Sequence, residues 1–229
     1  MIAKINNGTG MNGMNKQDIF SRVDHTQLKA FASFSDIQKV CEEAISNHMA
    51  SVCIPPSYVR RVRDIYGNEL SICTVIGFPL GYNTTEVKVF ETQRAVADGA
   101  DEIDVVINIG DVKNGDLGRV ENELRLIRGA TKNKILKVIV ETCYLTKEEK
   151  IKLCRIVTDV EADYIKTSTG FGTDGARVSD IELFRNNIGF DVKIKAAGGI
   201  KTAEQFRSFY DAGCDRIGAS ATLSAFEEG

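Results

Sequence analysis

The chain has 229 residues, of which 43% are hydrophobic and 27% are charged. This composition is typical of a globular protein and excludes a largely disordered chain. The 29 basic and 32 acidic residues leave a net charge of −3, so neither a basic surface for nucleic acid nor a polybasic membrane patch is expected. No apolar run reaches the roughly 18 residues of a membrane span, and the first residues lack the apolar stretch of a secretory signal.

The cysteines and histidines indicate a reducing compartment. Six cysteines occur without a C-x-x-C pair, mostly within apolar stretches, and the chain has two histidines. Free, buried thiols are therefore expected in place of a disulfide framework. Zinc ligation by His and Cys is not expected from so few histidines, and we predict a cytoplasmic protein without a metal.

Taken in chain order, residues 1–18 are rich in Gly, Asn and Lys and are predicted to form a flexible leader before one domain over residues 19–229. Eight segments of that domain are rich in Val, Ile or aromatic residues. Several are continuous apolar runs, as expected of strands buried on both faces. The predicted strands are 19–23, 50–54, 70–78, 102–109, 135–141, 164–169, 192–196 and 216–219.

Helical patterns lie between these strands. Ser35 is the predicted N-cap of the first, in which apolar residues recur at helical spacing. Two others stop at Gly99 and Gly213, a residue type favoured just past a helix end, and one opens with T-K-E-E, a capping-box pattern. The predicted helices are 35–47, 85–98, 146–162 and 202–212.

The alternation of strands with crossovers of helix length predicts parallel βαβ units. Eight such units without a dividing linker fit a single-domain α/β fold, the (β/α)₈ TIM barrel. An open doubly wound sheet is the alternative, but eight strands suit a closed barrel better than a sheet of five or six.

Three of the predicted strands carry polar residues at positions where burial of an apolar residue costs less free energy. Period-two alternation places Asp104 on one face of its strand and Lys166 on one face of another. Lys195 lies on the next strand along the chain. A lysine inside a buried strand is costly unless it is paired or neutralised, so stability alone does not favour this group.

Two lysines and a carboxylate suit amine catalysis. An amine must be neutral to attack a carbonyl, and burial together with a neighbouring cation favours the neutral form. One lysine is then the nucleophile, and the positive charge of the other favours the neutral form of that nucleophile. The carboxylate transfers protons. Buried Lys–Asp pairs also occur without function, and spacing alone leaves open which lysine reacts.

Small residues follow the last three strands, at 168–170, 197–199 and 218–220. Loops at this end of a barrel often bind phosphate, because glycine lets backbone N–H groups approach the oxygens. These glycines can also be simple turns and caps. Residues 170–175 match G-x-G-x-x-G, but the match follows the sixth predicted strand rather than the first, and we predict no nicotinamide binding.

Other polar residues are candidates for supporting roles. Asp24 and His25 follow the first predicted strand and can line the mouth of the barrel. Lys137 and Glu141 share a face of the fifth strand and can join the polar network or form a simple ion pair. Cys53, near the end of the second strand, can approach the site or be a buried thiol.

The chain resembles the deoxyribose-phosphate aldolase family over nearly everything after the leader. The stretches that carry the resemblance are D-H-T at 24–26, S-V-C-I-P-P at 51–56, T-V-I-G-F-P-L-G at 74–81, G-A-D-E-I-D-V-V at 99–106, L-K-V-I-V-E-T at 136–142, D-Y-I-K-T-S-T-G-F at 163–171, V-K-I-K-A-A-G-G-I at 192–200 and R-I-G-A-S at 216–220. The resemblance implies a class I aldolase without metal or cofactor that cleaves 2-deoxy-D-ribose 5-phosphate to acetaldehyde and D-glyceraldehyde 3-phosphate.

The same resemblance implies individual roles. Lys166 matches the imine-forming lysine, Lys195 its partner and Asp104 the proton shuttle. Barrels of this kind often pair, so a homodimer or higher homo-oligomer is expected. The residues expected to bind the substrate and its phosphate are Thr167, Gly170, Gly198, Gly199, Gly218 and Ser220. Lys193 stands where relatives often have a small residue. A Schiff-base aldolase for another phosphorylated sugar and a non-catalytic sugar-phosphate sensor are the alternative functions.

Overall fold

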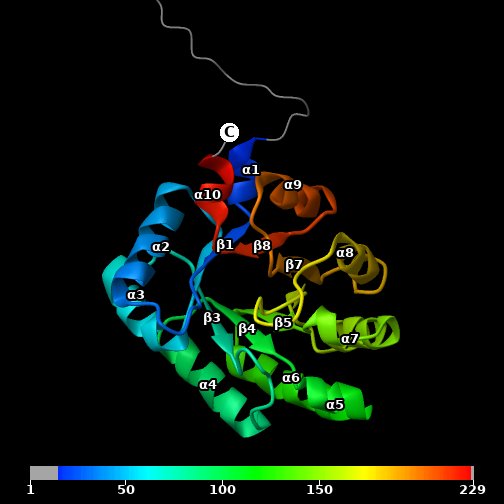
Figure 1. Ribbon diagram of the computed structural model, residues 1–229. Helices are drawn as coiled ribbons and strands as arrows, with labels where there is room; N and C mark the ends of the chain where they lie inside the picture. The colour runs from blue at the N-terminus through cyan, green and yellow to red at the C-terminus, as the bar shows by residue number, and fades with distance from the viewer. Residues whose placement is uncertain (1–14, 228–229) are drawn as a thin grey trace, which may run out of the picture.

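The computed structural model describes residues 15–227 as a closed barrel of eight parallel strands surrounded by helices (Figure 1). Each strand pairs with the next along the chain, and β8 pairs with β1. The predicted (β/α)₈ barrel is confirmed. The strands are β1 (Val23–Thr26), β2 (Ser51–Ile54), β3 (Ile72–Ile76), β4 (Glu102–Val106), β5 (Ile135–Ile139), β6 (Tyr164–Lys166), β7 (Lys193–Ala197) and β8 (Arg216–Ala219).

Helices connect the strands and cover the outside of the barrel (Figure 1). Two short 3₁₀ turns, Pro56–Tyr58 and Thr142–Tyr144, follow β2 and β5. The α-helices are α1 (Lys16–Phe20), α2 (Phe34–Ser46), α3 (Val59–Tyr66), α4 (Thr85–Ala97), α5 (Ile109–Asn114), α6 (Leu117–Thr131), α7 (Lys147–Asp159), α8 (Val178–Arg185), α9 (Ala203–Asp211) and α10 (Thr222–Glu227). Among the helices of residues 15–227, none is both long and apolar enough to cross a membrane.

Side-chain caps decide where several helices begin. The predicted capping box of α7 is present, with Thr146 as N-cap and Glu149 reaching back to it. The predicted N-cap Ser35 is wrong by two residues. Ser33 caps α2, because its backbone N–H donates to Asp36 (2.7 Å) and its hydroxyl accepts from the Asp36 N–H. Ser35 then lies in the first turn.

The first predicted strand, 19–23, is also wrong. Asn15 and Asp18 form a capping box that starts helix α1, and Ile19 and Phe20 belong to that helix. Phe20 is buried edge-on against Phe226 (5.3 Å). The strand itself begins at Val23, so the D-H-T motif lies within β1 rather than after it. Of the predicted leader, residues 1–14 lie outside the described part, and residues 15–18 cap and open α1.

Alternate residues of each strand face two different environments. Outward side chains such as Ile103, Val138 and Ile194 are fully buried in the apolar layer between the barrel and the helices. Burial of each such side chain contributes roughly 1.5–3 kcal/mol. Inward side chains include Asp104 and Lys195, which are equally buried. The outer apolar layer therefore stabilises a barrel whose interior carries charge.

Candidate active site

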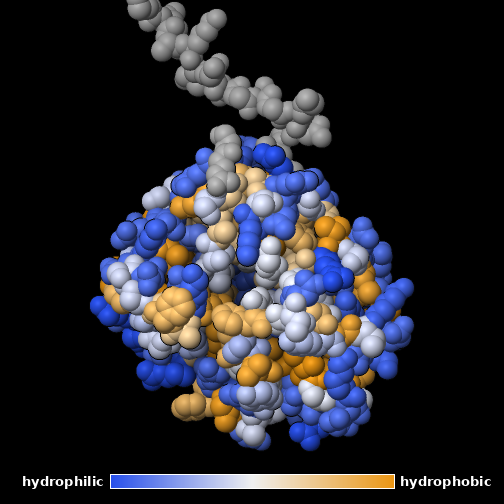
Figure 2. All heavy atoms as spheres, in the orientation of Figure 1, coloured by the Kyte–Doolittle hydropathy of each residue, from blue (hydrophilic) through white to orange (hydrophobic). Residues whose placement is uncertain are grey.

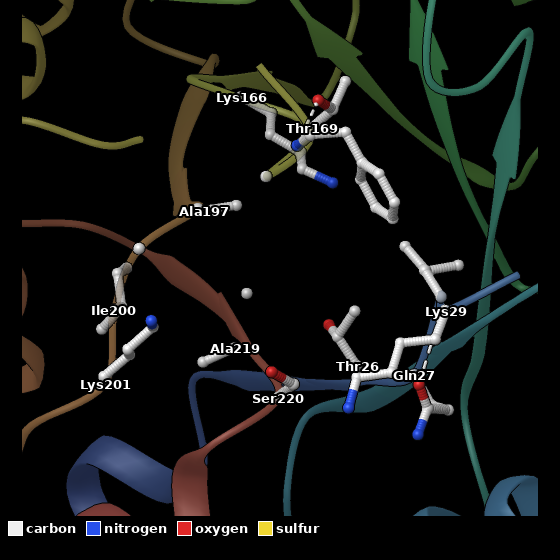
Figure 3. A pocket seen from close by; sticks show the side chains of 16 residues that line it. Thr26, Gln27, Lys29, Lys166, Thr169, Ala197, Ile200, Lys201, Ala219 and Ser220 are labelled. Atoms are coloured by element: carbon white, nitrogen blue, oxygen red, sulfur yellow. Dashed lines mark hydrogen bonds between the residues drawn. The ribbon is translucent and has the colours of Figure 1, made fainter. Parts of the chain in front are cut away.

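A pocket opens at the carboxyl ends of the strands, where a (β/α)₈ barrel carries its functional residues. Loops after β1, β6, β7 and β8 form its walls. In Figure 3 the amine of Lys166 points into the cavity from the end of β6, and Lys201 extends from the loop after β7. Thr26 and Ser220 lie on the side of β1 and β8. Figure 2 shows the molecule hollowed over the middle of the barrel.

Seven charged side chains meet inside the barrel below this pocket, and we call them the lumenal cluster. Each is at least nine-tenths buried, and each comes from an inward position of its strand. Buried charges are tolerated when they are paired and hydrogen-bonded. The members are Asp24, Glu102, Asp104, Lys137, Lys166, Lys195 and Arg216.

Asp104 lies at the centre of the lumenal cluster. Its Oδ2 accepts hydrogen bonds from Lys166 Nζ and Lys195 Nζ, both at 2.7 Å, and its Oδ1 accepts from Lys137 Nζ at 2.8 Å. Strand register brings these residues together, because Asp104 pairs with Lys137 and Lys166 pairs with Lys195. Burial alone raises the pKa of Asp104, but the three ammonium charges outweigh it and hold that pKa well below its usual range.

Asp24 anchors the other side of the lumenal cluster. It accepts from Lys195, from Arg216 and from Ser51 Oγ (2.7 Å). Burial disfavours the ammonium of Lys195, yet Asp104 and Asp24 outweigh this effect and raise the pKa of Lys195. Arg216 also reaches Glu102 (3.1 Å) and was not among the sequence candidates. An arginine inside the buried strand R-I-G-A was the available signal.

The partners of the three lysines differ in number. Lys137 contacts Asp24 (3.5 Å), Glu102 (2.5 Å) and Asp104, and Lys195 contacts Asp24 and Asp104. Within residues 15–227, Lys166 has Asp104 as its single carboxylate partner. It also lines the pocket, which Lys137 and Lys195 do not. The geometry therefore favours Lys166 as the reactive amine, which the spacing in the sequence left open.

The cluster also has more cations than anions. Four basic side chains face three carboxylates. An arginine does not lose its proton in proteins, and two of the lysines each contact at least two carboxylates. Lys166 is the lysine of the cluster with the fewest carboxylate partners.

The small residues predicted to bind phosphate lie on one side of the pocket. Gly170, Gly198, Gly199, Gly218 and Ser220 all line it. The backbone of Gly198 has φ 90°, and a Cβ there would lie 3.2 Å from the Cα of Gly170. Glycine is therefore required for the close approach of these loops. A Cβ at Gly218 would lie 3.1 Å from Lys195 Cε, so this glycine leaves room for the lysine.

The lining of this side of the pocket differs from the sequence expectation at two residues. Thr167 does not line it: the side chain is fully buried, and its Oγ1 bonds to the backbone of Ala197 (3.1 Å), which ties β6 to β7. Lys201 does line the pocket and was missed. The motif G-G-I-K offered a signal, since a cation just past a glycine pair suits an anion.

The remaining candidates make no ion pair with Lys166. His25 faces outward and bonds to Glu43 (2.7 Å). Glu141 does not pair with Lys137; its carboxylate instead accepts from the backbone and hydroxyl of Thr169, and burial raises the pKa of Glu141. Lys193 is exposed, with its amine 5.7 Å from the Tyr164 ring.

Cys53 is buried beside the lumenal cluster. All six cysteines are free, as expected. Cys53, Cys73 and Asp104 hold three potential metal ligand atoms within 4.8 Å of one another, as do Asp24, Cys73 and Glu102. In both sets the carboxylates already accept from lysine or arginine, and these charges oppose a further cation.

Residues 17–225 match the family model described as DeoC/LacD family aldolase. The chain belongs to this family. A deoxyribose-phosphate aldolase of Clostridium botulinum (strain Alaska E43 / Type E3) is 56% identical over 210 residues, which cover 92% of this chain and 95% of that protein. One from Clostridioides difficile (strain 630) is 52% identical over 203 residues, covering 89% and 93%.

Solved structures of aldolases agree with this family membership. An aldolase named QR15 has a TM-score of 0.88 and 38% identity, covering 92% of this chain and 95% of that chain. A deoxyribose phosphate aldolase from Aeropyrum pernix, described as a unique tetramer, has a TM-score of 0.86 and 28% identity, covering 93% and 92%. The DeoC/LacD aldolase fold thus extends over the whole barrel.

Proposed function

We propose that this DeoC/LacD family aldolase reversibly cleaves 2-deoxy-D-ribose 5-phosphate to acetaldehyde and D-glyceraldehyde 3-phosphate through a Schiff base on Lys166. The observation that carries the proposal is the Lys166 amine at the pocket floor, 2.7 Å from a carboxylate oxygen that it shares with Lys195. Curated relatives at 52–56% identity over most of the chain are deoxyribose-phosphate aldolases.

The proposed reaction begins at the aldehyde carbon of the open-chain sugar. The neutral amine of Lys166 adds to this carbon, and loss of water from the carbinolamine leaves an iminium ion. Removal of the proton from the C3 hydroxyl then breaks the C2–C3 bond, and the iminium takes up the electron pair as an enamine. Glyceraldehyde 3-phosphate leaves, the enamine gains a proton at C2, and water releases acetaldehyde.

Asp104 is the proposed proton carrier for these steps. Its Oδ2 bonds to both Lys166 and Lys195, so a proton can pass between the two amines through one oxygen. The resting carboxylate is an acceptor, because three ammonium charges hold the pKa of Asp104 low. When Lys166 is neutral, one of those charges is gone and Asp104 binds a proton more readily. Asp104 then exchanges protons with the substrate directly or through one water.

The glycine-rich side of the pocket is the proposed phosphate site. Gly170, Gly198, Gly199 and Ser220 line it, and Lys201 adds a positive charge. Backbone N–H groups at such glycines can approach phosphate oxygens closely. Gly218 contributes to the lining and leaves room for Lys195, whereas Thr167 holds β6 against β7. Lys137, Asp24 and Cys53 support the reactive groups from below.

Trapping with borohydride tests the proposal. Incubation with acetaldehyde and borohydride should add a two-carbon label to Lys166, and a coupled assay should detect glyceraldehyde 3-phosphate released from deoxyribose 5-phosphate. Lys166→Arg should abolish both signals, and Lys193→Arg, at an exposed position of β7, is the matched control. A wild-type enzyme that is active while Lys166 stays unlabelled contradicts the proposal. Binding and thermal stabilisation without product would indicate a sensor, and turnover of another phosphorylated sugar a related aldolase.

We also propose that the chain forms a homo-oligomer in the cytoplasm. The Aeropyrum pernix relative is tetrameric, and apolar side chains of this chain are exposed around α4, among them Tyr82, Val87 and Phe90. Free thiols are consistent with a reducing compartment. Light scattering coupled to size-exclusion chromatography tests the assembly, and a mass of about 25 kDa at micromolar concentration contradicts it.

A further inference from the structure

Glu141 is a buried carboxylate that the proposed reaction does not use. It follows β5 and is 2% exposed. Its carboxylate accepts from the backbone N–H of Thr169 (3.2 Å) and from the Thr169 hydroxyl, and the Cys143 thiol lies 3.9 Å away. In the described part of the chain Glu141 forms no ion pair, and it does not line the pocket. The hydrogen bonds from Thr169 therefore compensate the burial of this group.

These bonds fix the segment that follows β6, residues 167–172, which we call the β6 loop. Thr169 Oγ1 donates to Glu141 and accepts in turn from the backbone N–H of Phe171 (3.0 Å). Both Thr169 and Phe171 line the pocket. In Figure 3 Thr169 lies beside Lys166 at the edge of the cavity. The carboxylate of Glu141 thus anchors part of the pocket wall without lining the pocket itself.

The backbone at Glu141 follows the same segment. The N–H of Val140 donates to the carbonyl of Lys166 (3.1 Å), and the N–H of Thr142 donates to the carbonyl of Thr167 (2.9 Å). Between these two bonds Glu141 has φ 55°, a left-handed conformation that few residues other than glycine adopt. Such a conformation persists where the surrounding contacts fix it, and here those contacts come from the end of β6 and the β6 loop.

The β6 loop forms part of the proposed phosphate side of the pocket. A Cβ at Gly170 would lie 3.6 Å from the Cα of Gly198, and both glycines line the pocket. The amine of Lys166 is held separately, by Asp104 (2.7 Å) and by the pairing of β6 with β7. A displacement of the β6 loop therefore changes the phosphate side and leaves the reactive amine in place.

We propose that Glu141 is a positioning residue, whose carboxylate fixes the β6 loop through Thr169 in the conformation that receives the phosphate end of the substrate. This inference rests on the proposed function and adds a residue that does not line the pocket. A carboxylate can accept both bonds from Thr169 at once, and a loop that is ordered in advance lowers the entropy cost of binding. Loss of the carboxylate should therefore weaken binding of the phosphorylated substrate and leave bond cleavage unchanged.

Two sugars that differ only in the phosphate group test the inference. Cleavage of 2-deoxy-D-ribose 5-phosphate and of 2-deoxy-D-ribose releases the same acetaldehyde, so one assay coupled to an alcohol dehydrogenase gives kcat and KM for both. Glu141→Ala should raise KM for the phosphorylated sugar by about tenfold and change its kcat by less than about threefold. The kcat/KM for the sugar without phosphate, and the rate at which acetaldehyde and borohydride label Lys166, should stay near wild type.

Three further variants assign the effect to the hydrogen bonds of Glu141. Glu141→Gln keeps an oxygen for the Thr169 N–H and offers an N–H to the Thr169 hydroxyl, so its KM should lie within about threefold of wild type. Glu141→Asp keeps the charge but is one methylene shorter; it should raise KM as alanine does, and it replaces the alanine variant if that variant does not fold. Glu43→Ala is the matched control, because Glu43 bonds to the outward-facing His25 (2.7 Å), and it should affect neither sugar.

The outcomes separate the inference from the function on which it rests. If acetaldehyde and borohydride fail to label Lys166 in the wild type, the proposed function fails and the inference with it. If Lys166 is labelled, a folded Glu141→Ala or Glu141→Asp variant with the wild-type KM overturns the inference, as does an equal loss for the sugars with and without phosphate. Failure of both variants to fold would assign Glu141 to the stability of the barrel and overturn the inference as well.

Discussion

Two buried lysines of this barrel differ in what surrounds them. Lys88, in α4, lies outside the barrel wall and is fully buried; its amine donates to Glu123 (2.7 Å) and to the carbonyl of Val106 (2.9 Å). Lys166, inside the barrel, is buried almost as deeply but donates to Asp104, and its amine faces the pocket. Burial lowers the pKa of Lys88 and outweighs the charge of Glu123.

The comparison shows that a buried lysine with a lowered pKa does not by itself indicate a nucleophile. Lys88 and Glu123 form one balanced pair that closes the contact between α4 and α6. Lys166 belongs to a cluster with four cations, three carboxylates and an opening to the pocket. Access to substrate and an unbalanced charge, rather than depth of burial, distinguish the reactive amine.

The largest expected effect on activity is at Lys166. Lys166→Met should lower kcat/KM by on the order of 10⁴-fold or more, because no other described amine lines the pocket next to Asp104. The protein should stay folded, since Asp104 keeps Lys137 and Lys195. The glyceraldehyde 3-phosphate assay and circular dichroism check both statements. Residual activity within tenfold of wild type would remove Lys166 from the mechanism.

Lys88→Met should have the opposite effect: it should lower the stability of the protein and leave the activity unchanged. It leaves Glu123 buried without its cation, and breaking a buried pair in this way costs about 3–5 kcal/mol. Urea denaturation should show this loss, while kcat/KM at a temperature where the variant is folded stays close to wild type. The variant that combines Lys88→Met with Glu123→Leu should regain much of the stability. Loss of activity in the folded Lys88→Met variant would contradict the purely structural role of Lys88.

Lys195→Leu should change the pH dependence of the reaction. Without the ammonium of Lys195, Asp104 carries a less compensated negative charge and holds a proton on Lys166 more firmly. The rising limb of kcat/KM against pH should shift upward by on the order of one unit. Lys195→Arg, which keeps the charge, is the control. A Leu variant with wild-type activity and an unshifted profile contradicts the role of Lys195.

The smallest expected effect is on stability in acid. Because the pKa values of Asp24 and Asp104 are lowered in the folded state, the unfolded chain takes up protons first as pH falls below about 4. The free energy of unfolding therefore decreases from pH 5 to pH 3. Urea midpoints should show a smaller decrease for Asp104→Asn. The variant with both Lys88 and Glu123 replaced should show the wild-type decrease; a difference there would place the acid response outside the barrel interior.

The barrel and the centre of the site could be predicted from the sequence because both depend on period-two alternation. Apolar and β-branched residues marked β2 to β8, and the parity of Asp104, Lys166 and Lys195 placed them inside. Parallel register then brings such residues together. The first strand was misplaced because the apolar residues Ile19 and Phe20 follow a capping box, which makes them the end of a helix.

Other parts of the site depend on contacts between distant segments. The number of carboxylates around each lysine involves strands up to 171 residues apart, as for Asp24 and Lys195, and no local pattern encodes it. Arg216 has a local signal, because it is a charged residue within the apolar strand R-I-G-A. Lys88 gave none, because a single lysine on a helix is usually solvated, and its burial follows from the packing of α4 on α6.

The glycines of the G-x-G-x-x-G match allow close packing of the backbone, whereas the pattern suggests dinucleotide binding. A Cβ at Gly175 would lie 2.2 Å from the carbonyl oxygen of Gly198, and Gly198 in turn touches Gly170. The segments after β6 and β7 thus meet through bare main chain. Directed evolution of this enzyme for new substrates will find these positions closed to variation. Leu28 and Phe78, which follow β1 and β3, offer side chains that can be exchanged without parting the two segments.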